Sequence, residues 1–295
     1  MKGIILAGGT GSRLWPLTIP ISKQLLPVYD KPMIYYPIST FMLAGIREIM
    51  IITRPEEVSL FEKLLGDGKD WGVNFQYEVQ AKPAGIAEAF LIAEKFLDGQ
   101  GASLILGDNL FYGSGLGESL GKISVENNAT IFGYQVANPR EYGVIELDSF
   151  GAPKGIEEKP KSPKSNFAIP GLYFYPGDVS SKARSLKLSA RGELEISDLN
   201  KLYLLEGRLE VRLLNRGTLW MDTGTIDDLH NAAAFVKIVE ERQQIKIACP
   251  EEIAFMNGWI NLKNLLDNQN NKYSSSYRTY LELVLNRISE DERHP

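Results

Sequence analysis

Two cations and a run of small residues lie near the N-terminus in a pattern suited to binding phosphate groups. The run Gly8-Gly9-Thr10-Gly11-Ser12 directly follows an apolar segment, and Arg13 and Lys23 come after it. Glycine leaves backbone N–H groups uncovered and tolerates positive φ, so such a turn can wrap closely around an anion. The planar guanidinium of Arg13 matches phosphate oxygens, and the Lys23 ammonium adds a compact, mobile charge. The pattern indicates a polyphosphate-binding loop in an enzyme that transfers phosphoryl or nucleotidyl groups.

Two other nucleotide-binding loops do not fit this stretch. The dinucleotide fingerprint G-x-G-x-x-G requires a third glycine, and Leu14 occupies that position, which argues against an NAD-dependent oxidoreductase. The Walker loop requires a lysine within the turn, and none occurs between Gly8 and Arg13. The glycines by themselves would also fit a simple tight turn, so the functional interpretation depends on the residues around them.

Two aspartates are candidate metal ligands. Asp108 and Asp222 each follow a short apolar segment and precede a turn. Mg²⁺ prefers carboxylates together with phosphate oxygens and water. We expect the two side chains to converge on one nucleotide-bound Mg²⁺, although Asp222 alone would also fit a simple loop cap. An ionised phosphate oxygen needs no general base, so the lack of a suitably placed histidine agrees with this chemistry.

The first part of the chain alternates between strand and helix patterns that could position these residues. The expected strands are residues 4–7, 48–53, 73–79 and 103–107, and the expected helices are residues 33–44, 55–65 and 87–97. This alternation predicts an α/β fold with a mostly parallel sheet flanked by helices, which binds ligands at the carboxyl ends of its strands. The glycine loop and Asp108 both follow such ends, so one crevice can hold both. Pro37 lies inside the first helix and is expected to kink or interrupt it.

The middle of the chain has a different pattern. Strands are expected at residues 129–135, 143–147, 155–160 and 171–175, with no long helix between them. They predict an added β-rich layer that closes over one side of the crevice. Asp222 is expected in a loop at residues 217–225.

The last part of the chain is predicted to be helical. The helical pattern starts at residue 226, and the last expected helix lies near residues 280–288. Ser274–Ser276 and the Asn-rich stretch before them predict a flexible joint. We therefore expect an α/β domain at residues 1–228 and a helical region at residues 229–295 that packs on the same domain.

Composition excludes several classes of protein. The chain of 295 residues has 32 basic and 37 acidic residues and a formal net charge of −5, which is unfavourable for general nucleic-acid binding. Local cations and backbone amides must therefore hold any anionic substrate. Cys249 is the only cysteine, so neither an intrachain disulfide nor a cysteine metal cluster can form. No leader pattern and no membrane-spanning window is found, so we expect a cytoplasmic protein without a membrane partner.

Several motifs together resemble those of the sugar-1-phosphate nucleotidylyltransferases. The glycine loop is followed by Ser22-Lys23-Gln24-Leu25-Leu26-Pro27, and further motifs come in the order found in that family. These are Gly107-Asp108-Asn109, Glu157-Glu158-Lys159-Pro160, Gly192-Glu193-Leu194-Glu195-Ile196 and Trp220-Met221-Asp222-Thr223-Gly224. The resemblance covers nearly the whole chain and implies a Rossmann-like, GT-A-like nucleotidyltransferase fold. Within the family, the motifs are most similar to those of the bacterial glucose-1-phosphate thymidylyltransferases.

The resemblance also implies roles for individual residues. Arg13 and Lys23 would act directly on the reacting phosphates. The implied nucleotide-binding residues are Gly8, Gly9, Thr10, Gly11, Ser12, Arg13, Lys23, Gln24, Gln80, Pro83, Gly85 and Asp108. The implied sugar-phosphate residues are Asn109, Gly143, Glu158, Lys159, Ile169 and Tyr173, and the implied metal ligands are Asp108 and Asp222.

The implied reaction is transfer of a thymidylyl group from dTTP to α-D-glucose 1-phosphate, which yields dTDP-glucose and pyrophosphate. Mg²⁺ would be the cofactor, deoxysugar and polysaccharide biosynthesis would use the product, and the assembly would be a homotetramer. A UTP-dependent uridylyltransferase and a non-catalytic sugar-nucleotide sensor remain as alternatives. The family usually has Pro-Asp-Gly in the base loop, where this chain has Pro83-Ala84-Gly85, so the choice between thymine and uracil stays open.

Overall fold

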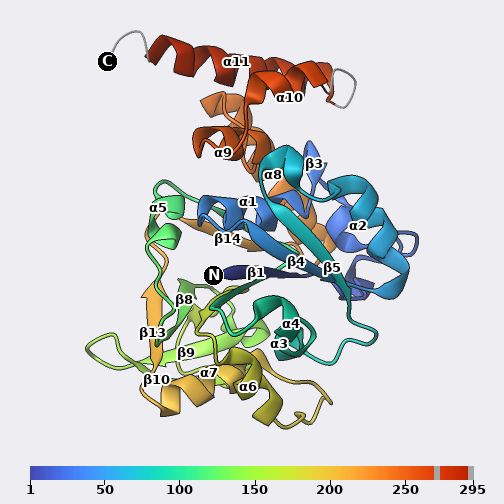
Figure 1. Cartoon of the computed structure of the whole chain (residues 1–295). Coiled ribbons are helices and arrows are strands. Elements are labelled where there is room, and N and C mark those ends of the chain that lie inside the picture. Colours follow the sequence, from blue (N-terminus) through green and yellow to red (C-terminus); the bar gives the residue numbers. More distant parts are fainter. Residues whose placement is uncertain (269–272, 292–295) are drawn as a thin grey trace.

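A ten-stranded mixed sheet forms the centre of the protein (Figure 1). The computed structural model describes residues 1–268 and 273–291 of the chain. Strands β1 (Lys2–Leu6), β4 (Glu48–Thr53), β5 (Asn74–Val79) and β6 (Ala102–Leu106) run parallel in the order β6-β1-β4-β5. β1, β4 and β6 are largely apolar, as is typical of parallel strands that are covered on both faces. The predicted α/β arrangement of this part is confirmed.

The β-rich part of the chain continues the same sheet. Its strands are β8 (Ala129–Gln135), β9 (Gly143–Leu147), β10 (Pro153–Glu158), β11 (Phe167–Ala168), β12 (Leu172–Tyr175) and β13 (Leu209–Leu213). β12 pairs antiparallel with both β6 and β8, so it joins the parallel half to the added strands. The order continues as β8-β11-β9-β10, and β13 pairs parallel with β8. The predicted mixed sheet with an added β-rich part is confirmed, and hydrogen bonds make that part continuous with the parallel strands.

Helices cover both faces of the sheet. Figure 1 shows α1 (Tyr35–Leu43) and α2 (Val58–Leu65) on one side, and α3 (Ala89–Ile92), α4 (Glu94–Leu97), α6 (Val179–Ser185) and α7 (Ile196–Leu205) on the other. Successive strand residues point to opposite faces. Accordingly, Ile5 packs in one core with Phe41 of α1, whereas Ile4 packs in a second core with Phe90 of α3. These two cores fix the sheet, and with it the loops at the ends of its strands.

A short ribbon of two strands lies where the sequence predicted a loop. Residues Leu219–Asp222 form β14, which pairs antiparallel with β7 (Asn109–Tyr112). The expected loop at residues 217–225 is therefore partly a strand. The apolar and polar residues of this segment do not alternate, so the pairing could not be recognised from the sequence. The register places Asp222 opposite Asn109, which brings the two predicted metal-binding segments together.

Two predicted helix features differ from the structure. Pro37 does not interrupt α1, because it is the third residue of that helix and its missing N–H is one that needs no partner within the helix. The helix expected at residues 87–97 is divided into the 3₁₀ turn Ile86–Glu88, α3 and α4. The break falls at Ala93, whose ψ of 3° lies outside the α-helical range.

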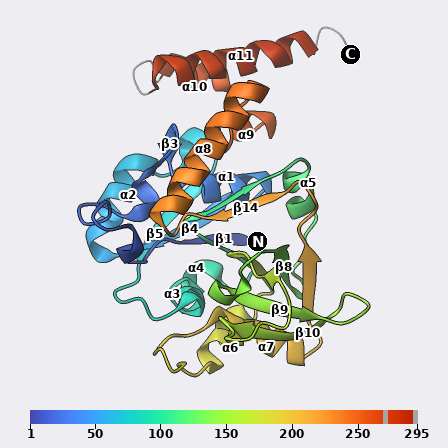
Figure 2. The same ribbon diagram turned by 180° about the vertical axis from the view of Figure 1, so that it is seen from behind.

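The C-terminal part is helical, as predicted. Its helices are α8 (Ile226–Gln243), α9 (Pro250–Met256), α10 (Leu262–Asn268) and α11 (Ser275–Asp291). Earlier in the chain, α5 (Leu116–Gly121) packs beside α1. Figure 2 shows α8 crossing the back of the molecule toward α9, with α10 and α11 lying together beyond it. Cys249 is buried in the core formed by α9, α10 and α11.

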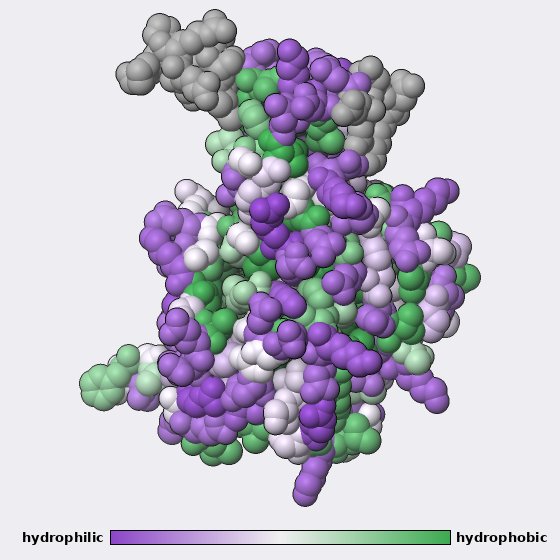
Figure 3. Space-filling model, viewed as in Figure 1, coloured by the Kyte–Doolittle hydropathy of each residue, from purple (hydrophilic) through white to green (hydrophobic). Residues whose placement is uncertain are grey.

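Some expectations about the C-terminal part remain predictions. The boundary proposed after residue 228 falls inside α8, and the division of the chain into two parts is untested. Ser275 begins α11, whereas most of the Asn-rich part of the expected joint lies outside the described residues. None of the described helices is long and apolar enough to span a bilayer. Figure 3 shows hydrophilic residues over much of one face, with apolar residues between them.

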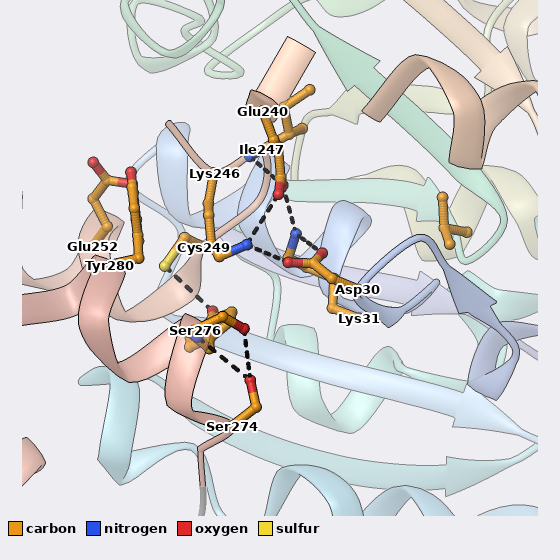
Figure 4. A network of polar contacts seen from close by, with 12 residues as sticks. Asp30, Lys31, Glu240, Lys246, Ile247, Cys249, Glu252, Ser274, Ser276 and Tyr280 are labelled. Carbon is orange, nitrogen blue, oxygen red and sulfur yellow. Dashed lines mark hydrogen bonds and ion pairs between the residues drawn. The ribbon is translucent and has the colours of Figure 1, made fainter. Parts of the chain in front are cut away.

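A buried network of charges ties the first part of the chain to the helical part (Figure 4). It joins the hairpin of β2 (Pro27–Val28) and β3 (Lys31–Pro32) to the end of α8. Lys31 Nζ lies 2.6 Å from Asp30 Oδ1 and 2.9 Å from Glu240 Oε1. Lys246 pairs with the same two carboxylates. The hairpin directly follows the segment that carries Lys23. The network therefore restrains the C-terminal end of that segment.

Replacement of Lys31 by methionine is expected to destabilise the protein by about 1.5–3 kcal/mol, because it removes the hydrogen bonds of the ammonium to Asp30 and to the buried Glu240, whereas Lys246 still pairs with both carboxylates. Lys31 is only 3% exposed, so water cannot replace the lost ammonium. Urea unfolding would measure the change. Lys122→Met is the matched control, because its ion pair with Glu118 is exposed and worth roughly 0–1 kcal/mol. Equal stabilities of the two variants would contradict this interpretation.

Candidate active site

A cavity of about 210 Å³ opens at the carboxyl ends of the strands. It brings together most of the predicted sugar-phosphate and metal residues, which lie far apart in the sequence. The predicted residues in its wall are Arg13, Asp108, Asn109, Gly143, Glu158, Lys159, Ile169, Tyr173 and Asp222. Lys23, the glycine loop and the base loop are not part of this wall but lie next to it. The cavity therefore contains the predicted metal and sugar-phosphate residues, whereas a shared crevice with the glycine loop remains a prediction.

The glycine loop follows β1 directly. Gly9 and Thr10 are exposed, and Gly11 has φ 63°, a conformation that favours glycine. The hydroxyl of Thr18 donates to the carbonyl of Gly11 over 2.8 Å and holds the turn in shape. The loop is thus an open, fixed turn at the end of a buried strand, as a phosphate site requires.

Asp108 and Asp222 lie side by side at one end of the cavity. Thr223 connects their loops, because its backbone N–H and its hydroxyl donate to the Asp108 carbonyl over 3.0 and 2.8 Å. The ammonium of Lys23 forms an ion pair with the Asp108 carboxylate. The two aspartates lie together, whereas their joint binding of Mg²⁺ remains a prediction.

The two carboxylates have opposite electrostatic environments. Burial alone would raise the pKa of Asp108, but the Lys23 ammonium and hydrogen bonds outweigh it and lower this pKa. Burial, and then the neighbouring charge of Asp108, raise the pKa of Asp222 to about 7. The Oδ1 atom of Asp222 is buried and has no hydrogen-bond partner among the described residues. An unsatisfied buried carboxylate oxygen beside a second carboxylate fits a divalent cation, which would supply the missing partner.

Arg13 lies near the Asp222 carboxylate, whose pKa its positive charge tends to lower. A Cβ atom on Gly224 would lie 2.6 Å from Arg13 Nη2 and 3.0 Å from Asp222 Oδ1. The guanidinium and the carboxylate therefore lie in the space that this glycine leaves free, and a larger residue would displace them. The Trp220–Gly224 motif supplies both a carboxylate and the space for a cation.

The amide of Asn109 orients the metal-binding end of the cavity. Its Nδ2 donates to Asp108 Oδ1 over 2.9 Å, and its Oδ1 accepts from the indole of Trp220 over 2.5 Å and from the backbone N–H of Gly171 over 3.1 Å. The side chain lines the cavity, but both its Nδ2 and its Oδ1 atoms already form hydrogen bonds with the protein. Its predicted contact with the sugar remains untested.

Trp220 is a part of the wall that the sequence analysis did not assign to the site. Its ring packs edge-on against Tyr142 at 5.1 Å and Tyr134 at 5.6 Å. No signal in the sequence indicated this role, because the segment was expected to be a loop and its residues do not alternate as in a strand.

The opposite end of the cavity carries Glu158 and Lys159. Gly143 allows the Glu158 carboxylate to lie close to the backbone, because a Cβ atom on this glycine would be only 3.3 Å from Glu158 Oε2. Burial raises the pKa of Glu158. Lys159 has φ 44°, and its backbone N–H donates to the carbonyl of Tyr142 over 3.0 Å. Tyr173 is buried in the floor, which raises its pKa.

The base loop is held by the Gly192–Ile196 motif. The backbone N–H of Leu194 donates to the Ala84 carbonyl over 2.7 Å. A Cβ atom on Gly85 would lie 2.3 Å from the Leu194 carbonyl oxygen, so no other residue fits there. Pro83 is exposed next to this contact, and Gln24 is buried and accepts a hydrogen bond from Ser22 over 2.6 Å. The motif thus positions the loop that carries Pro83 and Gly85, two of the implied nucleotide-binding residues.

This arrangement defines a nucleotidyltransferase site, and the comparisons with known proteins agree. The profile of the nucleotidyl transferase family matches residues 2–238. The chain belongs to this family, and within it to the glucose-1-phosphate thymidylyltransferases. It is 52% identical to that enzyme from Mycobacterium tuberculosis over 97% of this chain and 100% of the relative. It is 55% identical to the Xanthomonas campestris enzyme over 90% of each chain.

Solved structures support the same fold. A Bacillus anthracis protein in complex with sucrose is 41% identical, with a TM-score of 0.74 over 80% of this chain and 94% of the other. A UDP-glucose pyrophosphorylase in complex with UDP-glucose is 24% identical, with a TM-score of 0.70 over 80% and 98%. The second likeness concerns the fold alone.

Proposed function

We propose that this protein transfers a thymidylyl group from dTTP to α-D-glucose 1-phosphate. A phosphate oxygen of the sugar phosphate attacks the α-phosphorus of dTTP, and a new P–O bond forms. The bond from the α-phosphorus to the bridging oxygen of the β-phosphate breaks, and pyrophosphate leaves. The products are dTDP-glucose and pyrophosphate. The observation that carries this proposal is one cavity lined by Arg13, Asp108, Asp222, Glu158 and Lys159, with Lys23 paired to Asp108 beside it.

The side chains supply charge and position in this reaction. The attacking phosphate oxygen is already ionised at neutral pH, so the site needs no general base. Two anions must come together, and the cations Arg13, Lys23 and Lys159 reduce their repulsion. Asp108 and Asp222 would hold Mg²⁺, which when bound neutralises phosphate charge and fixes the orientation of the triphosphate. Glu158 would accept hydrogen bonds from sugar hydroxyls.

The remaining expectations belong to the same proposal. The product would enter deoxysugar biosynthesis, for example of the dTDP-rhamnose type, and polysaccharide biosynthesis. The homotetramer and the cytoplasmic location rest on the family resemblance. A uridylyltransferase and a non-catalytic sensor are not favoured, because the relatives named above are thymidylyltransferases.

Competition between nucleotides tests the choice of donor. We expect dTTP to be the best donor and UTP to be used more slowly, because thymine and uracil differ by one methyl group on the base. A methyl group in an apolar pocket gives only about 1–3 kcal/mol of discrimination. Product formation from mixtures of dTTP, UTP, dCTP and ATP would measure the ratios of kcat/KM. A higher kcat/KM for ATP or dCTP than for dTTP would contradict the proposed donor.

A further inference from the structure

Both oxygens of the Asp108 carboxylate already have donors on the protein. The ammonium of Lys23 forms an ion pair with Oδ2, and Asn109 Nδ2 donates to Oδ1 over 2.9 Å. The side chains of Lys23 and Asp108 are only 12% and 11% exposed, so little solvent screens their attraction. A metal ion that binds Asp108 Oδ2 would therefore lie next to the ammonium and be repelled by it.

The charges around the two aspartates balance without a metal ion. Burial and the charge of Asp108 raise the pKa of Asp222, whereas the nearby charges of Lys23 and Arg13 lower it. When these two carboxylates and two cations are all ionised, they carry no net charge. A divalent cation that entered alone would leave excess positive charge in a largely buried place, where charges interact strongly. Phosphate oxygens that arrive with the ion would supply the missing negative charge.

Lys23 has a second place for its ammonium beside the glycine loop. A Cβ atom on Gly9 would lie 3.9 Å from Lys23 Cε, so the lysine stem runs along this loop. Gly9 and Thr10 are exposed, which leaves the loop open to a phosphate group. The backbone of Lys23 is held, because its carbonyl accepts from the N–H of Leu26 over 3.0 Å. The flexible stem therefore allows the ammonium alone to exchange a carboxylate for a phosphate.

We propose that Lys23 excludes free divalent cations from Asp108 and releases this carboxylate only when a triphosphate binds its ammonium. The ion pair and the metal site are then mutually exclusive, and the metal ion binds only together with the nucleotide. This inference rests on the proposed function, because it uses the assignment of Lys23 to the phosphates and of Asp108 to the metal. Mg²⁺ sites made of one or two carboxylates and substrate phosphates agree with such a sequence of events.

The test measures binding of Mn²⁺ in the absence of nucleotide. Mn²⁺ takes the same kinds of oxygen ligand as Mg²⁺, and the electron paramagnetic resonance signal of the free ion shows how much is bound. The measurement is made at pH 8, above the pKa of about 7 of Asp222. Lys23→Ala should bind Mn²⁺ with a Kd at least about tenfold lower than that of the wild type, because a neighbouring positive charge is removed. Lys23→Gln, which removes the charge but keeps a long polar side chain, should show the same change.

Lys159→Ala is the matched control. Lys159 lines the same cavity, but it neighbours Glu158, whose pKa is raised by burial and lowered by the charge of this lysine. Its loss should change the Kd for Mn²⁺ by less than about twofold, because its charge does not act on the two aspartates. The double variant Lys23→Ala/Asp108→Asn should lose the gained affinity, since a neutral amide is a poor ligand for such ions.

Equal Kd values for the wild type and the folded Lys23 variants would overturn the proposal. Tight binding that persists in the double variant would also overturn it, because the ion would then bind away from Asp108. Circular dichroism would establish that the variants are folded. Failure of the proposed function is a separate result, since it would appear as inactivity of the wild type with dTTP, whereas the Mn²⁺ measurement contains neither dTTP nor sugar phosphate.

Discussion

Replacement of Lys23 by alanine is expected to lower kcat by roughly 100- to 1000-fold, which is the usual effect of removing one preorganised charge at a reacting group. Negative charge moves toward the leaving pyrophosphate in the transition state, so a cation that binds it there contributes to kcat more than to KM. Lys23 lies beside Asp108 at the open end of the glycine loop, where the triphosphate is proposed to bind. Steady-state kinetics with saturating substrates would measure the change.

The control for Lys23→Ala must separate catalysis from stability. Loss of the ammonium leaves Asp108 without its charged partner, and the pKa of this carboxyl group is then expected to rise. Lys122→Ala, on an exposed ion pair, should leave kcat unchanged. Circular dichroism would establish that both variants are folded. A folded Lys23→Ala protein with near-normal kcat would show that Lys23 does not act on the phosphates.

Replacement of Asp222 by asparagine is expected to lower activity by at least about 100-fold and to weaken the dependence on Mg²⁺, because a neutral amide is a poor ligand for this ion. Asp108→Asn should have the same double effect, since the two carboxylates lie together. Titration of activity with Mg²⁺ would give the half-saturating concentration. Asp227→Asn in the first turn of α8 is the control. An unchanged half-saturating concentration in both site variants would refute the shared metal site.

The raised pKa of Asp222 also predicts how stability depends on pH. The carboxyl group ionises near pH 3.8 in the unfolded chain and near pH 7 in the native protein without ligands. Between these values the native state binds the extra proton, so the contribution of this group to stability falls as pH rises from about 4 to about 7. Asp222→Asn should therefore gain stability relative to the wild type at pH 8 compared with pH 5. The same stability difference at both values, measured by urea unfolding, would be inconsistent with the raised pKa.

Many of the strands and helices could be predicted from the sequence, because local residue patterns determine them. Buried parallel strands give apolar runs such as Ile4–Ala7, and the predicted bounds of β4, β8 and β9 coincide with those in the structure. The residues of the site could be proposed because their motifs resemble a known family. Asp108 follows the carboxyl end of β6 and lines the cavity, which agrees with the rule that ligands bind at such strand ends.

The features that could not be predicted depend on contacts between distant segments. The pairing of β14 with β7 places Trp220 beside Asn109, and neither segment alone indicates this. The bond from Gln80 to Glu88 depends on the direction of a loop that Leu194 holds from far along the chain. The effect of Pro37 was predicted wrongly because it depends on where α1 begins, and tertiary packing decides that position.

Pyrophosphate release tests the central claim most directly. The wild-type protein would be incubated with each of the common nucleoside triphosphates and a series of sugar 1-phosphates, with and without Mg²⁺. We expect the fastest release with dTTP and glucose 1-phosphate, with one dTDP-glucose formed for each pyrophosphate and almost no release when the sugar phosphate or Mg²⁺ is omitted. Release from dTTP without a sugar phosphate, or no release from any pair, would contradict the proposed reaction.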